Sequence, residues 1–154
     1  MTGSCYLYDT DTDTNNSTVY QQILDKMVTA FTSKGVAVII DLHWNCPDTT
    51  KLSCTGAQAA MALRNFGSNP GAIHMWDVIS KRYANNPLVL YELYNEPWIR
   101  TFTSWYGGDS QYAGMKEMYT AVRKNDPDGL VIIGGADQYA LDAQSGLAFY
   151  LQYK

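Results

Sequence analysis

The chain has 154 residues, of which 46% are hydrophobic and 17% charged, and this composition predicts one globular domain of ordinary size. Its formal net charge is −4, and lysine and arginine are scattered along the sequence, which argues against a nucleic acid or an anionic membrane as a partner. No apolar run is long enough to span a bilayer, and the first residues lack the basic and apolar regions of a signal peptide. We therefore expect a soluble domain, with no signal peptide in this sequence.

The sequence contains three cysteines, and Cys46 and Cys54 lie in one polar segment rich in threonine and serine. A short disulfide between them and a reduced pair are both compatible with the sequence, depending on the compartment. His43 and His74 lie far apart and form no grouping with zinc-ligand spacing. We therefore expect no metal and no cofactor.

Taken in chain order, residues 1–16 are predicted to form a loop, and strand and helix units are predicted over residues 17–154. Tyr20, Leu24, Met27 and Phe31 recur at helical spacing, which predicts a helix face towards the core, and Gly35 is expected to end that helix. Residues 36–44 follow as a strand. Its nearly continuous apolar character predicts burial on both faces, which is typical of a parallel sheet.

A long polar insertion is predicted over residues 45–69, with a short helical piece at 58–63. A second helix is expected to bury Trp76 and to end at the Asn-Asn-Pro run before the strand at residues 88–93. After Trp98 the pattern predicts a loop, then a third helix with Tyr112 on its apolar face, then a third buried strand at residues 130–134. The alternation of strands and helices predicts a parallel α/β sheet with right-handed crossovers.

Functional side chains are expected where these strands end, because ligands of parallel α/β sheets bind at the carboxyl ends of the strands. The second strand runs into Asn95-Glu96-Pro97. Pro97 cannot continue a sheet ladder and disfavours helical dihedrals in the residue before it, so Glu96 is expected to be extended at the start of a loop.

The sequence at these strand ends resembles glycoside hydrolase family 5, a (β/α)8 family that contains many cellulases (endo-β-1,4-glucanases). The resemblance rests on Asp41-Leu-His-Trp44, on Tyr91-Glu-Leu-Tyr-Asn-Glu-Pro97, and on Trp76 and Arg82-Tyr83 between them, in the same order. It implies a partial (β/α)8 TIM-type barrel, with about three parallel strands and crossover helices. Residues 1–154 would then be a middle portion of the family's catalytic domain.

The resemblance also implies roles for individual residues in a retaining hydrolysis of β-1,4-glucan. Glu96 matches the general acid/base, Asn95 the residue that contacts the sugar 2-hydroxyl, and His43 a substrate-contacting histidine. For Trp44 and Trp98, stacking on a sugar and capping the barrel rim stay equally open. The implied partner is a β-glucan polysaccharide or oligosaccharide, and the parent protein is expected to be secreted.

A retaining mechanism also requires a nucleophilic carboxylate about 5–5.5 Å from the acid/base. Of the three glutamates, Glu92 lies about 13 Å back along the same strand, at about 3.3 Å per residue, and Glu117 is predicted in a helix on the outside of the barrel. We expect Glu92 to be an internal charge paired with a neighbour, Asp41 to be structural, and neither Asp41 nor Asp137 to replace the nucleophile. The alternative to an enzyme is therefore a non-catalytic carbohydrate-binding fragment of a glycosidase.

Three parallel strands cannot close a barrel that needs eight, so sheet edges and apolar helix surface should remain uncovered. We therefore expect a homo-oligomer, or association with a missing barrel segment.

Overall fold

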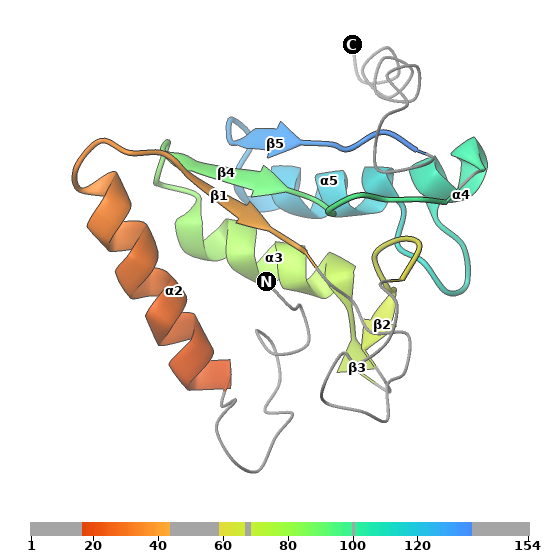
Figure 1. The fold of residues 1–154 in the computed structure, drawn as a ribbon, viewed down its shortest axis with the longest axis horizontal. Helices are drawn as coiled ribbons and strands as arrows, with labels where there is room; N and C mark the ends of the chain where they lie inside the picture. The colour runs from red at the N-terminus through yellow and green to blue at the C-terminus, as the bar shows by residue number, and fades with distance from the viewer. Residues whose placement is uncertain (1–16, 44–58, 67–68, 100, 137–154) are drawn as a thin grey trace.

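The computed structural model describes residues 17–43, 59–66, 69–99 and 101–136. Within these ranges lie five strands and four helices, shown in Figure 1. In chain order they are α2 (Ser17–Thr32), β1 (Val38–Asp41), β2 (Asn65–Phe66), β3 (Asn69–Pro70), α3 (Ala72–Tyr83), β4 (Val89–Glu92), α4 (Phe102–Gly107), α5 (Met115–Asn125) and β5 (Leu130–Ile132).

The central element is a three-stranded sheet with the order β1-β4-β5, in which both pairs are parallel. Asp41 is the register partner of Glu92, and Glu92 in turn is the partner of Ile132. The three arrows in Figure 1 accordingly run the same way, with α4 beyond their tips. The predicted order of helices and strands and the parallel α/β architecture are confirmed.

Helices α3 and α5 pack against each other and cover one face of the sheet. Trp76 of α3 is fully buried and meets Tyr91 of β4 edge to face at 6.1 Å between ring centroids. The indole of Trp76 also donates a hydrogen bond to the carbonyl of Leu93, at 3.1 Å. The prediction that Trp76 belongs to the core is confirmed.

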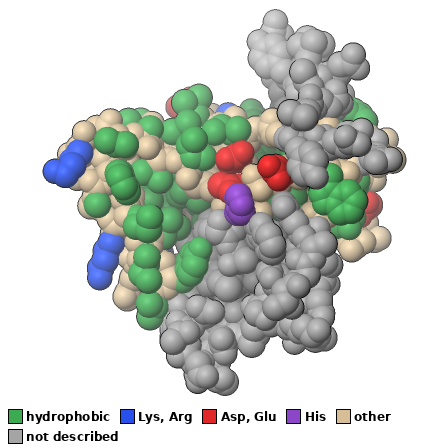
Figure 2. All heavy atoms as spheres, viewed as in Figure 1, with side chains coloured by type: hydrophobic (Ala, Val, Ile, Leu, Met, Phe, Trp, Pro, Cys, Tyr) green, Lys and Arg blue, Asp and Glu red, His purple; other side chains and the backbone are tan. Residues whose placement is uncertain are grey.

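The opposite face of the sheet is more open, so the prediction of burial on both faces is wrong for the residues that the structure describes. Side chains alternate along a strand, so Tyr91 points towards the helices while Leu90 and Glu92 point away from them. On this second face Ile39 is 52% exposed and Leu130 is 63% exposed. Figure 2 shows this face, with hydrophobic side chains around a central group of acidic side chains and a histidine. The two described crossover helices both lie behind the sheet, so they cannot cover this face.

Local structure differs from the sequence-based expectation in three places. Residues 59–63 form bends and an isolated bridge between Leu63 and Tyr112, not the expected helical piece. Residues 102–107 form the short helix α4, where a loop was predicted. The third helix begins at Met115, so Tyr112 precedes it. The expected loop over residues 1–16 and the pairing of Cys46 with Cys54 lie outside the described residues.

Helix α2 is joined to α3 by polar contacts: Arg82 forms an ion pair with Asp25, and the hydroxyl of Tyr83 donates to the same carboxylate at 2.7 Å. The Arg82 hydrogen bond is the largest influence on the Asp25 carboxyl and holds its pKa below the ordinary value. None of the described helices is both long and apolar enough to cross a lipid bilayer.

Candidate active site

The ends of β1, β4 and β5 form one rim because backbone pairing continues past the last strand residues. The amide of Leu42 donates to the carbonyl of Glu92 at 3.2 Å, and the amide of Asn95 donates back to the carbonyl of Leu42 at 3.1 Å. The amide of Leu93 donates to the carbonyl of Ile132, also at 3.1 Å. The segments carrying His43, Asn95 and Glu96 are thereby brought to the same end of the sheet.

Glu96 is exposed on this rim, in a backbone conformation with φ at +45°. The expected extended conformation is therefore wrong, although Glu96 does leave the strand and avoids the right-handed helical region. A left-handed conformation costs a residue with a side chain roughly 1–2 kcal/mol, so neighbouring contacts must hold it. The hydroxyl of Tyr94 donates to the carbonyl of Ala59 at 2.6 Å, and the amide of Trp98 donates to the carbonyl of Ala60 at 3.0 Å. The turn is thus fastened on both sides of Glu96.

Asp41, His43 and Glu92 form a polar cluster on the open face of the sheet, close to this rim. Nδ1 of His43 lies 2.6 Å from Oδ2 of Asp41. Burial raises the pKa of the Glu92 carboxyl above its ordinary value, the charge of Asp41 raises it further, and His43 lowers it. The register places the like-charged Asp41 beside Glu92, and the expected pairing of Glu92 with a neighbour stays a prediction.

Glu117 is an outer structural residue. It lies on α5 and forms a bidentate pair with Arg64, with Nη2 to Oε2 at 2.6 Å and Nη1 to Oε1 at 3.0 Å. Its Oε2 also accepts a hydrogen bond from the amide of Gly114 at 3.0 Å, which caps α5. The prediction of a helical, outward Glu117 is confirmed.

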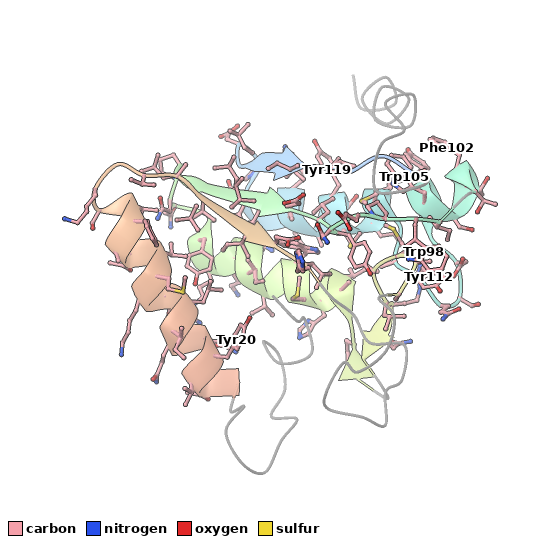
Figure 3. All side chains as sticks on the ribbon, viewed as in Figure 1. Tyr20, Trp98, Phe102, Trp105, Tyr112 and Tyr119 are labelled. Atoms are coloured by element: carbon pink, nitrogen blue, oxygen red, sulfur yellow. The ribbon has the colours of Figure 1, made fainter. Side chains whose placement is uncertain are left out.

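The structure describes some of the remaining candidate residues and not others. Trp98 is 50% exposed. Figure 3 shows Trp98 and Phe102 at the end of the molecule towards which the strands run. Trp44 and Asp137 lie outside the described residues. Sequence reasoning missed the bond between Asp41 and His43. Its signal was the spacing of the two residues, which places both side chains on one face of a strand.

A cavity of about 600 Å³ lies away from this rim, between α3, α5 and the β2–β3 hairpin. Its lining includes His74, Asp77 and Lys124. It is on the helical side of the sheet. Within the described ranges, no group of three or more His, Cys, Asp or Glu side chains could hold a metal ion.

Comparison with known proteins identifies relatives of this chain. A family model described as Cellulase (glycosyl hydrolase family 5) matches residues 4–149. Endoglucanase Z of Dickeya dadantii is 38% identical over 63 residues, which are 41% of this chain and 14% of that protein. An endoglucanase of Paenibacillus polymyxa is 25% identical over 120 residues, 75% of this chain and 28% of that protein. The chain therefore spans less than a third of the length of either relative.

Solved structures share the fold. The catalytic domain of Thermobifida fusca endoglucanase Cel5A superposes with a TM-score of 0.58 at 23% identity, over 85% of this chain and 36% of that one. Thermotoga maritima Cel5A in complex with cellobiose gives a TM-score of 0.60 at 18% identity, over 90% of this chain and 39% of the other. The likeness concerns the fold, and it covers a little over a third of each larger chain.

Proposed function

This chain belongs to glycosyl hydrolase family 5, and we propose that it carries the acid/base half of a retaining hydrolysis of β-1,4-glucan. The observation that supports this proposal is the placement of Glu96 at the rim formed by the ends of three parallel strands. Its carboxyl group is exposed at the end of β4, in a turn fastened on both sides. Residues 1–154 would then act as one partial catalytic domain, with strand and helix units over residues 17–154.

In this proposal Glu96 acts twice. Its carboxylic acid first protonates the oxygen of the leaving sugar, and its carboxylate then removes a proton from the water that completes hydrolysis. An exposed carboxyl group at a rim can reach both the glycosidic oxygen and water. Glu96 lies beyond the end of β4 at Glu92, in a backbone conformation with positive φ.

We also propose substrate contacts for residues other than Glu96. Asn95 would contact the 2-hydroxyl of the sugar at the cleavage point, and His43 would contact a second hydroxyl. Trp98, which is half exposed, offers an apolar ring on which the flat face of a sugar can stack, and we assign the same role to Trp44. A neutral glucan suits a rim that needs hydrogen bonds and ring faces more than charge.

The nucleophile is proposed to come from another strand of the barrel. A nucleophilic carboxylate must be ionised, whereas burial and the charge of Asp41 both raise the pKa of Glu92. Glu117 is held by Arg64 on the outer helix. The larger relatives contain barrel segments that this chain does not match, and a strand from such a segment would bring the second carboxylate to the rim.

The relatives support a proposal for the substrate of this chain and for the location of the parent protein. Thermobifida fusca and Thermotoga maritima endoglucanases have been crystallised with cellotetraose and cellobiose, and the Thermotoga protein also with mannotriose. We infer a β-linked glucan for this chain. Because such a polymer is too large to enter a cell, we infer that the parent protein acts outside it.

The experiment compares the unsubstituted chain with Glu96→Gln, measuring reducing-sugar release and calorimetric binding of cellotetraose. An amide keeps the shape of the side chain but cannot deliver a proton, so hydrolysis should fall about 10²- to 10⁴-fold while binding is kept. Asp128→Asn makes the same chemical change in the exposed turn before β5, at the opposite end of the sheet, and should change neither. Hydrolysis retained in Glu96→Gln would contradict the assignment.

A carbohydrate-binding fragment without activity is the second candidate function. It is favoured by one observation: neither Glu92 nor Glu117 suits the role of nucleophile among the described residues. An unsubstituted chain that binds cellotetraose but releases no reducing sugar would support this candidate over the first.

A further inference from the structure

The contact between Asp41 and His43 determines which imidazole nitrogen carries a proton. A carboxylate only accepts hydrogen bonds, so at 2.6 Å from Oδ2 the Nδ1 atom of His43 must be the donor. In a neutral imidazole the proton is then on Nδ1, and Nε2 keeps its lone pair. The His43 side chain is 53% exposed, whereas that of Asp41 is 21% exposed. The bond to Asp41 occupies Nδ1, and about half of the His43 side chain remains exposed.

We propose that Asp41 is a positioning residue, which holds His43 in the Nδ1–H tautomer so that Nε2 accepts a hydrogen bond from a hydroxyl group of the glucan. This inference rests on the proposed function, because it assumes that His43 meets substrate. It assigns to Asp41 a role beyond the stability of β1. A ring without this bond could turn about its side-chain torsions and could present either a donor or an acceptor to the sugar.

The sheet places Glu92 beside the bond between Asp41 and His43. The register between β1 and β4 makes Asp41 and Glu92 direct neighbours. Two adjacent carboxylates do not both ionise readily, and here the raised pKa of Glu92 shows which one resists ionisation. A protonated Glu92 places no second negative charge beside the bond between Asp41 and His43.

The test is a nitrogen NMR spectrum of the imidazole rings in the ¹⁵N-labelled full chain. His43 and His74 are the two histidines of the sequence, so the spectrum of His74→Gln identifies the His43 signals. We expect the Nδ1–H tautomer in the unsubstituted chain. In Asp41→Asn the amide can present either an oxygen or an N–H group to the ring, so the fraction with a proton on Nδ1 should fall. Cellotetraose binding should weaken by about tenfold, the value of one hydrogen bond.

Two control substitutions separate positioning from general disturbance. Asp77→Asn makes the same change on α3, at a carboxylate that pairs with Lys124, and should alter neither the His43 signals nor binding. Glu92→Gln changes the neighbouring group and leaves the bond between Asp41 and His43 in place, so the tautomer should persist.

A double-mutant cycle covers the case in which Asp41→Asn weakens the fold. If Asp41 acts through the ring, Asp41→Asn should have no further effect on binding once His43 has been changed to Gln. A proton on Nε2 in the unsubstituted chain, an unchanged tautomer in Asp41→Asn, or additive losses in the cycle would each overturn the proposal. If the unsubstituted chain bound no cellotetraose, the proposed function would fail, whereas the nitrogen signals would still decide how His43 is held.

Discussion

Glu96 combines an exposed carboxyl group with a backbone conformation that costs free energy. Among the residues that the structure describes, Glu96 is the one residue other than glycine with a positive φ, at +45°. Such conformations persist where surrounding contacts enforce them, and they are frequent at functional sites. Glutamine has the same backbone preference, so Glu96→Gln keeps this cost. A loss of hydrolysis in that variant would therefore report on the proton and not on relief of strain.

Glu92 should make stability depend on pH. Its native pKa is raised above the ordinary value of 4.5, so it favours the folded state at pH below that value, and this contribution is lost as the pH rises through the native pKa. Glu92→Gln cannot ionise. We expect it to be more stable than the unsubstituted chain at neutral pH and to lose this advantage below about pH 4.5. Urea unfolding at several pH values measures the difference, and a variant less stable at pH 7 would contradict the interpretation.

The end of α4 and the start of α5 approach each other closely at Gly114. A Cβ atom on Gly114 would lie 2.3 Å from the amide nitrogen of Gly108 and 2.4 Å from the carbonyl carbon of Gly107, both of them backbone atoms. Trp105 of α4 is fully buried, and its indole donates to the carbonyl of Gly134 at 3.0 Å. The helix is therefore held between the start of α5 and the end of β5.

We expect Gly114→Ala to lower the free energy of unfolding by about 1–3 kcal/mol, because the backbone around it must move. Gly107→Ala is the matched control: its Cβ would meet nothing within 4 Å, and alanine favours a helix over glycine by up to about 1 kcal/mol. Chemical denaturation of both variants tests the difference. Equal stabilities would show that α4 and α5 can separate at no cost.

At the scale of the whole molecule, the part of the chain that the structure describes exposes several large apolar side chains. On α2 a stripe of four side chains, each about half exposed, runs along one side of the helix: Val19, Ile23, Met27 and Phe31. The prediction that Met27 and Phe31 face the core is therefore wrong, whereas Tyr20 and Leu24 do pack against it. Ile39 and Leu130 add exposed apolar surface on β1 and β5, which are the two edges of the described three-stranded sheet. Exposed edges and apolar patches of this kind favour association with another chain.

We therefore predict that the chain alone is not a stable monomer and forms a homo-oligomer or binds a missing barrel segment. Analytical ultracentrifugation over a concentration series measures this association. Ile23→Gln, in the α2 stripe, should weaken it, whereas Lys34→Gln, at an exposed residue beyond the end of α2, should not. A monodisperse monomer at every concentration would contradict the prediction.

Local sequence patterns determined the three longer helices, the three parallel strands and the position of the principal candidate residue. Helical spacing in the segment of α3 and the apolar runs of β1, β4 and β5 depend on neighbours along the chain, so they could be recognised directly. The same local reasoning placed Glu96 at a strand end, Trp76 in the core and Glu117 on an outer helix. The family resemblance of the strand-end motifs was also visible in the sequence alone.

Only the tertiary structure decided how the candidate residues meet. The bond between Asp41 and His43, the neighbouring Glu92, the left-handed turn at Glu96 and the open face of the sheet all depend on packing between distant segments. Strand register is set by contacts between β1 and β4, and α4 forms because Trp105 is buried against the end of β5. Periodicity describes one segment at a time, and these features arise between segments.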